Sequence, residues 1–281
     1  RWRTERYRKQ RREWSAREWD GGDPGGKRIP VHAGQGLGDT LQFCRYLPLL
    51  AGRGAVVTVE CADTLRPLLA GMKGVDAVIA PGDRLPRIDA HIPMLSLPKA
   101  FGTDENSIPA EVPYLTPPKS ALAKWEKIAE RWPDGPRIGI AWRGSPAHTR
   151  DALRSPGLAP FGAMADIDGA VLVSLQKEGG AAELAASDLA IVDPTADIHD
   201  FGDTAALMTH LDWVIACDTA PLHLAGALGR RTVAVLPHVA EWRWGREGER
   251  SPWYPTLRLV RQPAFGDWAG AFERVVGMLE K

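Results

Sequence analysis

The feature that most constrains the fold is a repeated alternation of short, β-branched apolar segments with segments of helical character. Such alternation is typical of parallel sheets with helices packed on their faces. In the first half, strands are predicted at Arg28–Ala33, Ala55–Glu60, Asp76–Ala80 and Asp89–Ile92, and helices at Thr40–Leu50 and Ala62–Gly71. In the second half, strands are predicted at Arg137–Trp142, Ala170–Ser174, Leu189–Val192, Trp213–Cys217, Thr232–Leu236 and Thr256–Arg261, and a last helix at Trp268–Lys281.

A proline-rich segment separates the two alternating series. Residues Ile108–Pro118 carry four prolines, and Ser120–Trp132 then predicts a helix that connects two domains. Two such domains form a cleft between the carboxyl ends of their sheets, where ligands of open α/β folds usually bind. The sequence therefore predicts two α/β domains with a ligand site at those sheet edges.

Composition excludes several other classes of protein. The 281 residues include 35 Lys and Arg and 35 Asp and Glu, so no overall field attracts nucleic acid. Cys44, Cys61 and Cys217 are far apart and odd in number, which argues against a disulfide framework and favours a reducing compartment. No apolar run is long enough to span a membrane, and we expect a cytoplasmic location.

Residues 1–20 are unusually basic, with eight Lys or Arg against four acids and interleaved aromatic side chains. One interpretation is a basic helix that binds RNA or an anionic lipid surface. The interpretation that we favour is the tail of a helical region upstream, because the chain does not begin with Met. Residues 21–26 (GGDPGG) then predict a linker.

The first motif with chemical potential is GQGLGDT, residues 34–40, directly after the first predicted strand. Its glycines allow a tight turn and close approach of a ligand. Asp39 stands where the dinucleotide fingerprint has a glycine, and its carboxylate would repel a pyrophosphate, so an NAD site is disfavoured. Asp39 suits either a general base that takes a proton from a hydroxyl or a helix cap, and the spacing alone leaves both open.

The second motif is DTAPLH, residues 218–223, after the predicted strand Trp213–Cys217. Pro221 and Gly229 suit the start and end of a helix whose first amides would bind an anion. His223 would donate to a phosphate oxygen, although a histidine at such a position is, taken alone, more often structural.

Two further groups of side chains are predicted at the same edge of the second sheet. Cationic and polar residues follow two neighbouring strands: Arg143, His148, Arg150, Arg154, Gln176 and Lys177. From the sequence, these side chains either bind a ligand or are simply exposed to solvent, and both interpretations stay open. Trp242, Trp244, Trp253 and Tyr254 could stack on sugars or bases, or pack between domains.

These motifs, taken together, resemble a bacterial glycosyltransferase domain related to the family 9 heptosyltransferases and often found behind tetratricopeptide repeats. The resemblance extends from about Val31 onward and rests on residues 34–50, 139–155, 174–177, 200–207, 217–229 and 251–262. It implies an α/β fold of the GT-B type, with two Rossmann-like domains facing a central cleft. Its implied domains are residues 27–118 on the acceptor side, 119–264 on the nucleotide-sugar side and a last helix, 265–281, that crosses back to the first, while 1–26 would be the tail of upstream repeats.

The resemblance also implies roles for individual residues. Asp39 would be the catalytic base. The nucleotide sugar would be bound by Gly36, Gly38, Thr40, Arg143, Arg154, Gln176, Lys177, Asp218, Thr219, Ala220 and His223. We expect an inverting transfer from a nucleotide-diphosphate sugar to a glycan or protein hydroxyl, with no metal and no cofactor. Gly34 stands where similar sequences often have an acid, so a non-catalytic nucleotide-sugar-binding or scaffold domain is the alternative.

Overall fold

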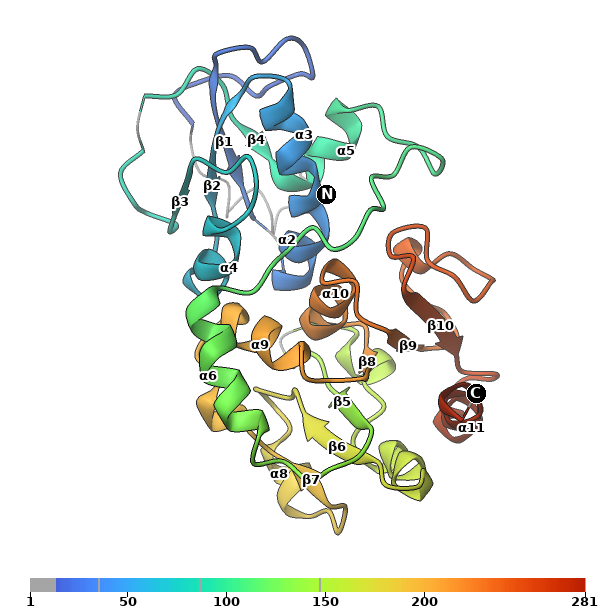
Figure 1. Cartoon of the computed structure of the whole chain (residues 1–281). Helices are drawn as coiled ribbons and strands as arrows, with labels where there is room; N and C mark the ends of the chain where they lie inside the picture. The colour runs from blue at the N-terminus through green and yellow to red at the C-terminus, as the bar shows by residue number, and fades with distance from the viewer. Residues whose placement is uncertain (1–13, 35, 86, 147, 281) are drawn as a thin grey trace. The chain divides into compact units, whose positions relative to one another are not determined.

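The computed structural model describes residues 14–34, 36–85, 87–146 and 148–280. The chain divides into two compact units, and the boundary along the chain falls between Pro109 and Ala110 (Figure 1). The sequence predicted this boundary within the proline-rich segment and the start of the second domain at residue 119. Residues after Ala110 already belong to the second unit because the backbone amides of Tyr114 and Leu115 donate to the carbonyl of Ala227.

The first unit is built on a four-stranded parallel sheet of order β3-β2-β1-β4. Its strands are β1 (Arg28–His32), β2 (Val56–Glu60), β3 (Ala77–Ile79) and β4 (Ile92–Pro93). Its helices are α2 (Leu37–Phe43), α3 (Leu47–Gly52), α4 (Arg66–Ala70) and α5 (Leu97–Ala100), with 3-10 turns at Cys44–Tyr46, Asp63–Leu65 and Met94–Ser96. All four strands predicted for this half are present, although β4 begins only at Ile92.

The single helix predicted over Thr40–Leu50 is in fact three pieces. Helix α2 ends at Phe43, a 3-10 turn follows, and α3 begins at Leu47. Pro48 lies in the first turn of α3, where its missing N–H costs no hydrogen bond. The same proline would interrupt the hydrogen bonding of a continuous helix, which explains the break.

The N-terminal helix predicted for residues 1–20 is absent from residues 14–20, while residues 1–13 lie outside the described part of the chain. Glu18 instead forms a parallel bridge to His91, beside β4. The amide of Trp19 donates to the carbonyl of His91, and the buried Trp19 ring packs edge-on against Phe101. Burial of that indole and the backbone pairing favour an extended chain here over a helix.

The second unit carries a six-stranded parallel sheet of order β10-β9-β8-β5-β6-β7. Its strands are β5 (Arg137–Ala141), β6 (Val171–Ser174), β7 (Ile191–Val192), β8 (Trp213–Cys217), β9 (Thr232–Leu236) and β10 (Leu257–Arg261). Its α-helices are α6 (Lys119–Ala129), α7 (Asp151–Arg154), α8 (Ala181–Ala185), α9 (Phe201–Met208), α10 (Ala220–Ala227) and α11 (Trp268–Leu279). The 3-10 helices of this unit are Ala159–Asp166, Thr195–Asp197 and Trp242–Trp244.

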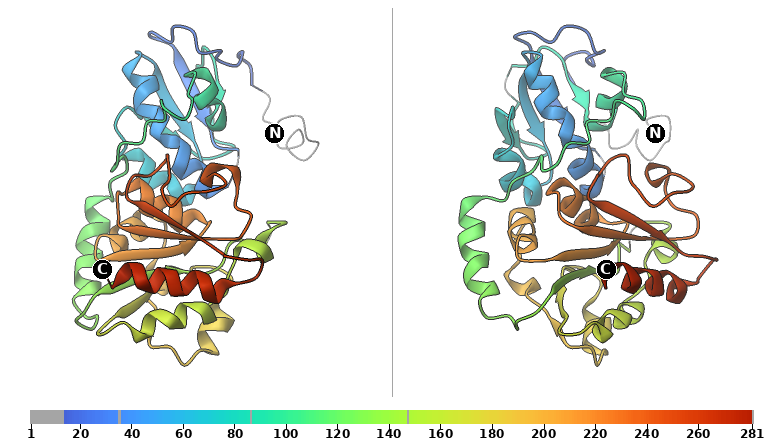
Figure 2. Two further views of the ribbon diagram at one scale, coloured as in Figure 1. Left: turned by 90° about the vertical axis from the view of Figure 1, so that its right-hand side faces the viewer. Right: turned by 45° about the vertical axis from the view of Figure 1, so that its right-hand side comes forward.

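The last helix, α11, packs into the core of the second unit (Figure 2). Phe272 meets Phe161 of the 3-10 helix edge-on, with ring centroids 4.6 Å apart, and Val275 is fully buried. The apolar face of α11, with Ala271, Phe272 and Val275, is therefore buried in the core of the second unit. A crossing of residues 265–281 back to the first domain stays a prediction.

Candidate functional site

Arg154 is the cation most firmly placed at the carboxyl edge of the second sheet. It ends α7, and its Nε donates to Asp151 Oδ1 at 3.1 Å while its Nη1 donates to the carbonyl of Asp218 at 2.7 Å. Gly144 permits this packing, since a Cβ on it would lie 2.5 Å from Arg154 Nη2. Among the described residues, Nη2 has no hydrogen-bond partner. The guanidinium is thus held in place by Nε and Nη1, and both N–H groups of Nη2 are left to donate.

The start of α10 lies directly beside this guanidinium. Strand β8 ends at Cys217, and Thr219 is the N-cap with an extended backbone, φ −141° and ψ 174°. The Thr219 hydroxyl donates to the carbonyl of Cys217 at 3.2 Å and does not cap the helix. The first amides of α10, beginning at Ala220, therefore receive no side-chain cap from Thr219.

Asp218 is buried and ionised next to those amides. Burial alone would raise the pKa of its carboxyl. The hydrogen bond and charge of His223 and the charge of Arg243 outweigh burial and lower that pKa from 3.8 to about 2. The carboxylate is therefore neutralised by partners inside the protein.

His223 belongs to this internal network rather than to the surface, with only 2% of it exposed. Its Nδ1 lies 2.9 Å from the Tyr254 hydroxyl, and its Nε2 lies 3.5 Å from Asp218 Oδ1 and 3.3 Å from Arg243 Nη1. The Tyr254 ring also packs against Gly226 of α10, where a Cβ would approach to 2.5 Å. A direct bond from His223 to a phosphate stays a prediction. In this conformation the imidazole fixes the start of α10 to the chain after β9.

A pocket of about 300 Å³ opens at this edge of the sheet. That volume is at the lower end of the range for small-molecule sites. It is lined by His148, Arg150, Ala152, Leu153, Arg154, Asp218, Pro237, Val239, Glu241, Gln262, Phe265, Gly266 and Trp268. Two predicted binding residues, Arg154 and Asp218, are thereby brought together at one cavity.

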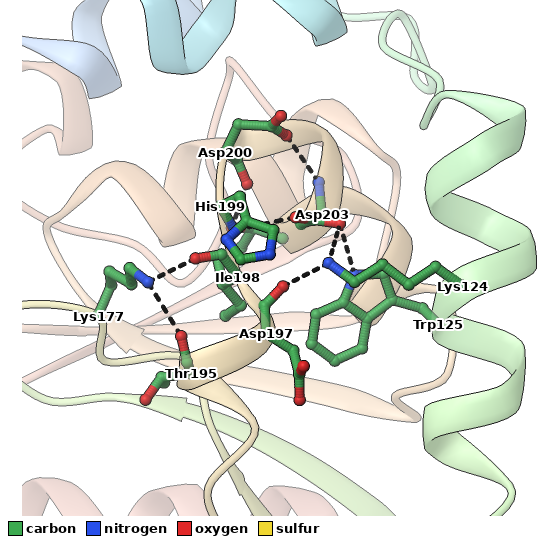
Figure 3. Close-up of polar contacts among 10 residues, drawn as sticks. Lys124, Trp125, Lys177, Thr195, Asp197, Ile198, His199, Asp200 and Asp203 are labelled. Atoms are coloured by element: carbon green, nitrogen blue, oxygen red, sulfur yellow. Dashed lines mark hydrogen bonds and ion pairs between the residues drawn. The ribbon is translucent and has the colours of Figure 1, made fainter.

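Three other predicted binding residues are used to tie loops together. Gln176 Oε1 accepts from the amides of Trp142 and Arg143, at 3.0 and 2.9 Å. Arg143 Nε pairs with Glu183 at 2.9 Å, which raises the pKa of the guanidinium and lowers that of the carboxyl. Lys177 donates to the carbonyls of Thr195 and Ile198 (Figure 3). In the described part of the chain, none of Gln176, Arg143 and Lys177 lines the pocket. Their binding role stays a prediction.

The DFGD segment, residues 200–203, is structural in this conformation (Figure 3). Asp200 caps α9 by accepting from the amide of Asp203. Asp203 accepts from Lys124 Nζ and Trp125 Nε1 of α6, at 2.9 and 3.0 Å. Burial would raise the pKa of Asp203, but these bonds and the His199 amide lower it. The segment joins α9 to α6.

In the first unit, the glycine-rich motif also begins a helix. Gly36 is the N-cap of α2, and Asp39 lies in its first turn, half-buried. Thr40 is buried, and its hydroxyl donates to the Gly36 carbonyl at 3.3 Å. Asp39 therefore lies at the carboxyl end of β1, where the sequence placed it.

A histidine pair beside this motif was not singled out from the sequence. His32 ends β1, and its Nε2 lies 3.3 Å from Nδ1 of His91. Trp14 stacks on both imidazoles with centroids 4.8 Å away. Only the pairing of β1 with β4 brings these residues together.

Residues that follow β9 and β10 were also missed as parts of the pocket. Pro237 and Val239 come after β9, and Gln262, Phe265 and Trp268 come after β10. Their position after buried strands was the available signal, because the carboxyl ends of parallel strands share one edge. No charge or glycine pattern marked them.

Comparison with known proteins finds a partial match to one glycosyltransferase family. A model of glycosyltransferase family 9 (heptosyltransferase) matches residues 193–264, which include β8, α10 and part of the pocket. Protein FlbA of Caulobacter vibrioides is 27% identical over 290 residues, covering 93% of this chain and 48% of FlbA. The chain thus spans about half the length of this curated relative.

Solved structures share the fold. The family 9 glycosyl transferase of Veillonella parvula superposes with a TM-score of 0.66 at 13% identity, covering 93% of this chain and 98% of its own. The ADP-heptose LPS heptosyltransferase II of E. coli gives a TM-score of 0.62 at 14% identity, covering 90% and 100%. The prediction of an α/β fold of the GT-B type, with parallel sheets, is confirmed.

One finding bears on the membrane. Among the described residues, no helix combines the length and apolar character that a membrane crossing requires.

Proposed function

We propose that this chain is a glycosyltransferase domain whose second unit binds the diphosphate of a nucleotide sugar and whose Asp39 acts as general base. The family 9 model over residues 193–264 supports sugar transfer, and the E. coli protein of similar fold is an ADP-heptose LPS heptosyltransferase. The cytoplasmic location, the glycan or protein acceptor and upstream tetratricopeptide repeats remain parts of this proposal.

The observation that carries the proposal is a fixed guanidinium beside the start of α10, at the edge of the sheet where Arg154 and Asp218 line one pocket. Arg154 is anchored by Asp151 and by the Asp218 carbonyl, and its Nη2 remains available. The positive end of the α10 dipole lies next to it. A diphosphate bound there would replace water as the partner of both groups, as anions do at many helix N-termini.

The proposed reaction is a single displacement. The acceptor hydroxyl gives its proton to the Asp39 carboxylate while its oxygen attacks the anomeric carbon. The bond from that carbon to the diphosphate oxygen breaks, and the configuration inverts. The negative charge that grows on the leaving diphosphate is stabilised by Arg154 and the α10 amides, so we propose that no metal ion is needed. Such preorganised donors typically contribute about 3–4 kcal/mol to the transition state.

The first test is Arg154→Met with calorimetric titration of ADP, UDP, GDP and CDP. Loss of a charged hydrogen bond costs about 1.5–3 kcal/mol, so affinity for the best diphosphate should fall about 10-fold to 100-fold. Arg231→Met is the matched control, because Arg231 precedes β9 at the opposite edge of the same sheet and stacks on Trp213. Equal affinities of wild type and R154M would refute the phosphate assignment.

A second measurement separates transfer from binding alone. Wild-type protein is incubated with the sugar nucleotide of the best-binding diphosphate, and released diphosphate is followed with and without EDTA. Release that is insensitive to EDTA supports a metal-independent transferase. Tight binding with no release, even over days, would favour the non-catalytic alternative.

A further inference from the structure

Gln262 is a buried polar side chain whose orientation is fixed by two backbone amides. It follows β10 directly, and only 4% of it is exposed. Its Oε1 accepts from the amide of His238 at 3.1 Å and from the amide of Gly266 at 3.4 Å. Only an oxygen can accept from two N–H groups, so the amide cannot be placed the other way round.

The nitrogen of the same side chain is left as a donor at the pocket. Gln262 lines the cavity that also contains Arg154 and Asp218. Among the described residues, Gln262 Nε2 has no hydrogen-bond partner. Since Gln262 lines the pocket, a ligand atom that accepts a hydrogen bond can take the place of solvent as the partner of Nε2. Because Oε1 is already engaged, Gln262 can donate to a ligand but has little capacity left to accept from one.

Part of the wall of this pocket is apolar and aromatic. Phe265 and Val239 line the pocket and are 72% and 67% exposed. The Phe265 ring lies 5.2 Å from the His238 ring, the same residue whose amide holds Gln262. An exposed aromatic face in the same pocket as the Gln262 amide donor fits a flat heterocycle with an acceptor on its edge. Arg154, on the wall of the same pocket, supplies the charge for an attached diphosphate.

We propose that Gln262 selects the nucleobase of the sugar donor by donating from Nε2 to a carbonyl oxygen or ring nitrogen of a base that stacks on Phe265. This inference rests on the proposed function, because it assigns the base end of the same nucleotide site. A base that presents an N–H group to Nε2 is rejected, because two donors face each other and no hydrogen bond forms between them.

The decisive variants are Gln262→Glu and Gln262→Met. In Q262E the carboxylate still accepts from the His238 and Gly266 amides but donates nothing, and in Q262M the side chain has similar length without charge. Affinities for ADP, UDP, GDP and CDP are measured beside that of inorganic pyrophosphate, which has no base. In wild type the best and worst nucleotides should differ at least about 10-fold, and in both variants by no more than about threefold. Pyrophosphate affinity should stay within about threefold in Q262M.

Phe265→Ala serves as the matched control on the same wall. Loss of stacking should weaken all four nucleotides by similar factors, about fivefold to 100-fold, and leave both base preference and pyrophosphate affinity unchanged. Thermal unfolding of each variant, without ligand, shows whether it is folded.

The outcomes separate this inference from the proposed function. If the folded Q262M and Q262E variants keep the base preference of wild type, the assignment of Gln262 is wrong while the nucleotide site stands. If Q262M loses pyrophosphate and nucleotides by equal factors, Gln262 merely shapes the pocket and the inference is again overturned. If wild type binds neither nucleotides nor pyrophosphate, the proposed function itself fails.

Discussion

The starts of α2 and α10 have similar backbone geometry and opposite electrostatics. Each follows a strand of a parallel sheet, and each N-cap, Gly36 or Thr219, is extended and gives no side-chain cap. In α2 the first turn carries the acid Asp39. In α10 the nearby carboxylate of Asp218 is buried and is neutralised by His223 and Arg243.

The difference teaches what each helix start can accept. A carboxylate in the first turn already takes the favourable interaction with the helix dipole, so the start of α2 disfavours a second anion. At α10 the carboxylate faces inward to cationic partners, and Arg154 adds positive charge at the amides. We therefore assign proton transfer to α2 and anion binding to α10, and the following predictions test that division.

The largest effect is expected for Asp39→Asn. Removing a general base typically slows a reaction about 10²–10⁴-fold, so sugar transfer should fall by that factor. Affinity for the nucleoside diphosphate should stay within about twofold, because the proposed phosphate site lies in the second unit. Transfer kinetics and calorimetry check the two halves of this prediction.

Asp63→Asn is the control for that change, since Asp63 also begins a helical turn after a parallel strand. Its side chain is 76% exposed and pairs only with the surface residue Arg66 among the described residues. D63N should transfer sugar at the wild-type rate. If D39N transfers sugar at the wild-type rate, Asp39 is not the general base, and the assignment of proton transfer to α2 is wrong.

A smaller effect, on stability, is expected for Asp218→Asn. The pKa of Asp218 is lowered from 3.8 to about 2 by folding, so its ionised form stabilises the native state by about 2 kcal/mol at neutral pH. That contribution is fully present above pH 3.8 and is lost as the pH falls towards 2. The variant should therefore lose about 2 kcal/mol of unfolding free energy at pH 7, measured with urea.

Asp188→Asn, in an exposed position of the same unit, should change the unfolding free energy by less than about 0.5 kcal/mol. The difference between wild type and D218N should also shrink below about pH 3. A constant difference down to about pH 2 would mean that packing, and not the charge of Asp218, is responsible.

The smallest effect concerns His148, which lines the pocket. Burial, and then the charge of Arg154, lowers the pKa of His148 below its usual 6.5, so the imidazole is neutral at pH 7. Protonation at lower pH adds a positive charge beside the proposed diphosphate. Affinity for ADP should therefore increase as the pH falls, by less than about tenfold.

His148→Gln should lack this gain, and calorimetry of both proteins between about pH 7.5 and about 5.5 compares them. ADP itself takes up a proton in this range, so the difference between the two proteins is the relevant quantity. Parallel pH profiles would exclude His148 from the anion site.

The sequence predicted strands best where burial is complete. Trp213–Cys217 and Thr232–Leu236 are β8 and β9 to the residue, because central parallel strands are apolar on both faces. The sequence predicted one short strand and one helix less accurately. Strand β4 is short, and the helix expected over Thr40–Leu50 is interrupted at Pro48.

For the candidate site, the sequence placed Asp39, Arg154 and Asp218 at the carboxyl edges of the sheets, since that placement follows from strand order along the chain. It did not predict that Lys177 and Arg143 satisfy local carbonyl and carboxylate groups. The partner of each of these side chains depends on which carbonyl or carboxylate group lies nearest after folding, and several such groups were possible from the sequence.

The sequence by itself determined the two α/β units, their parallel strands and the helix starts that carry charge, because periodicity and capping are local properties. Only the tertiary structure decided that His223 is enclosed by Tyr254 and Arg243, and that Gln262 is held by His238 with its nitrogen unpartnered among the described residues. These contacts join segments that are between 20 and 31 residues apart along the chain. Their geometry follows from packing around the sheet, which no local pattern encodes.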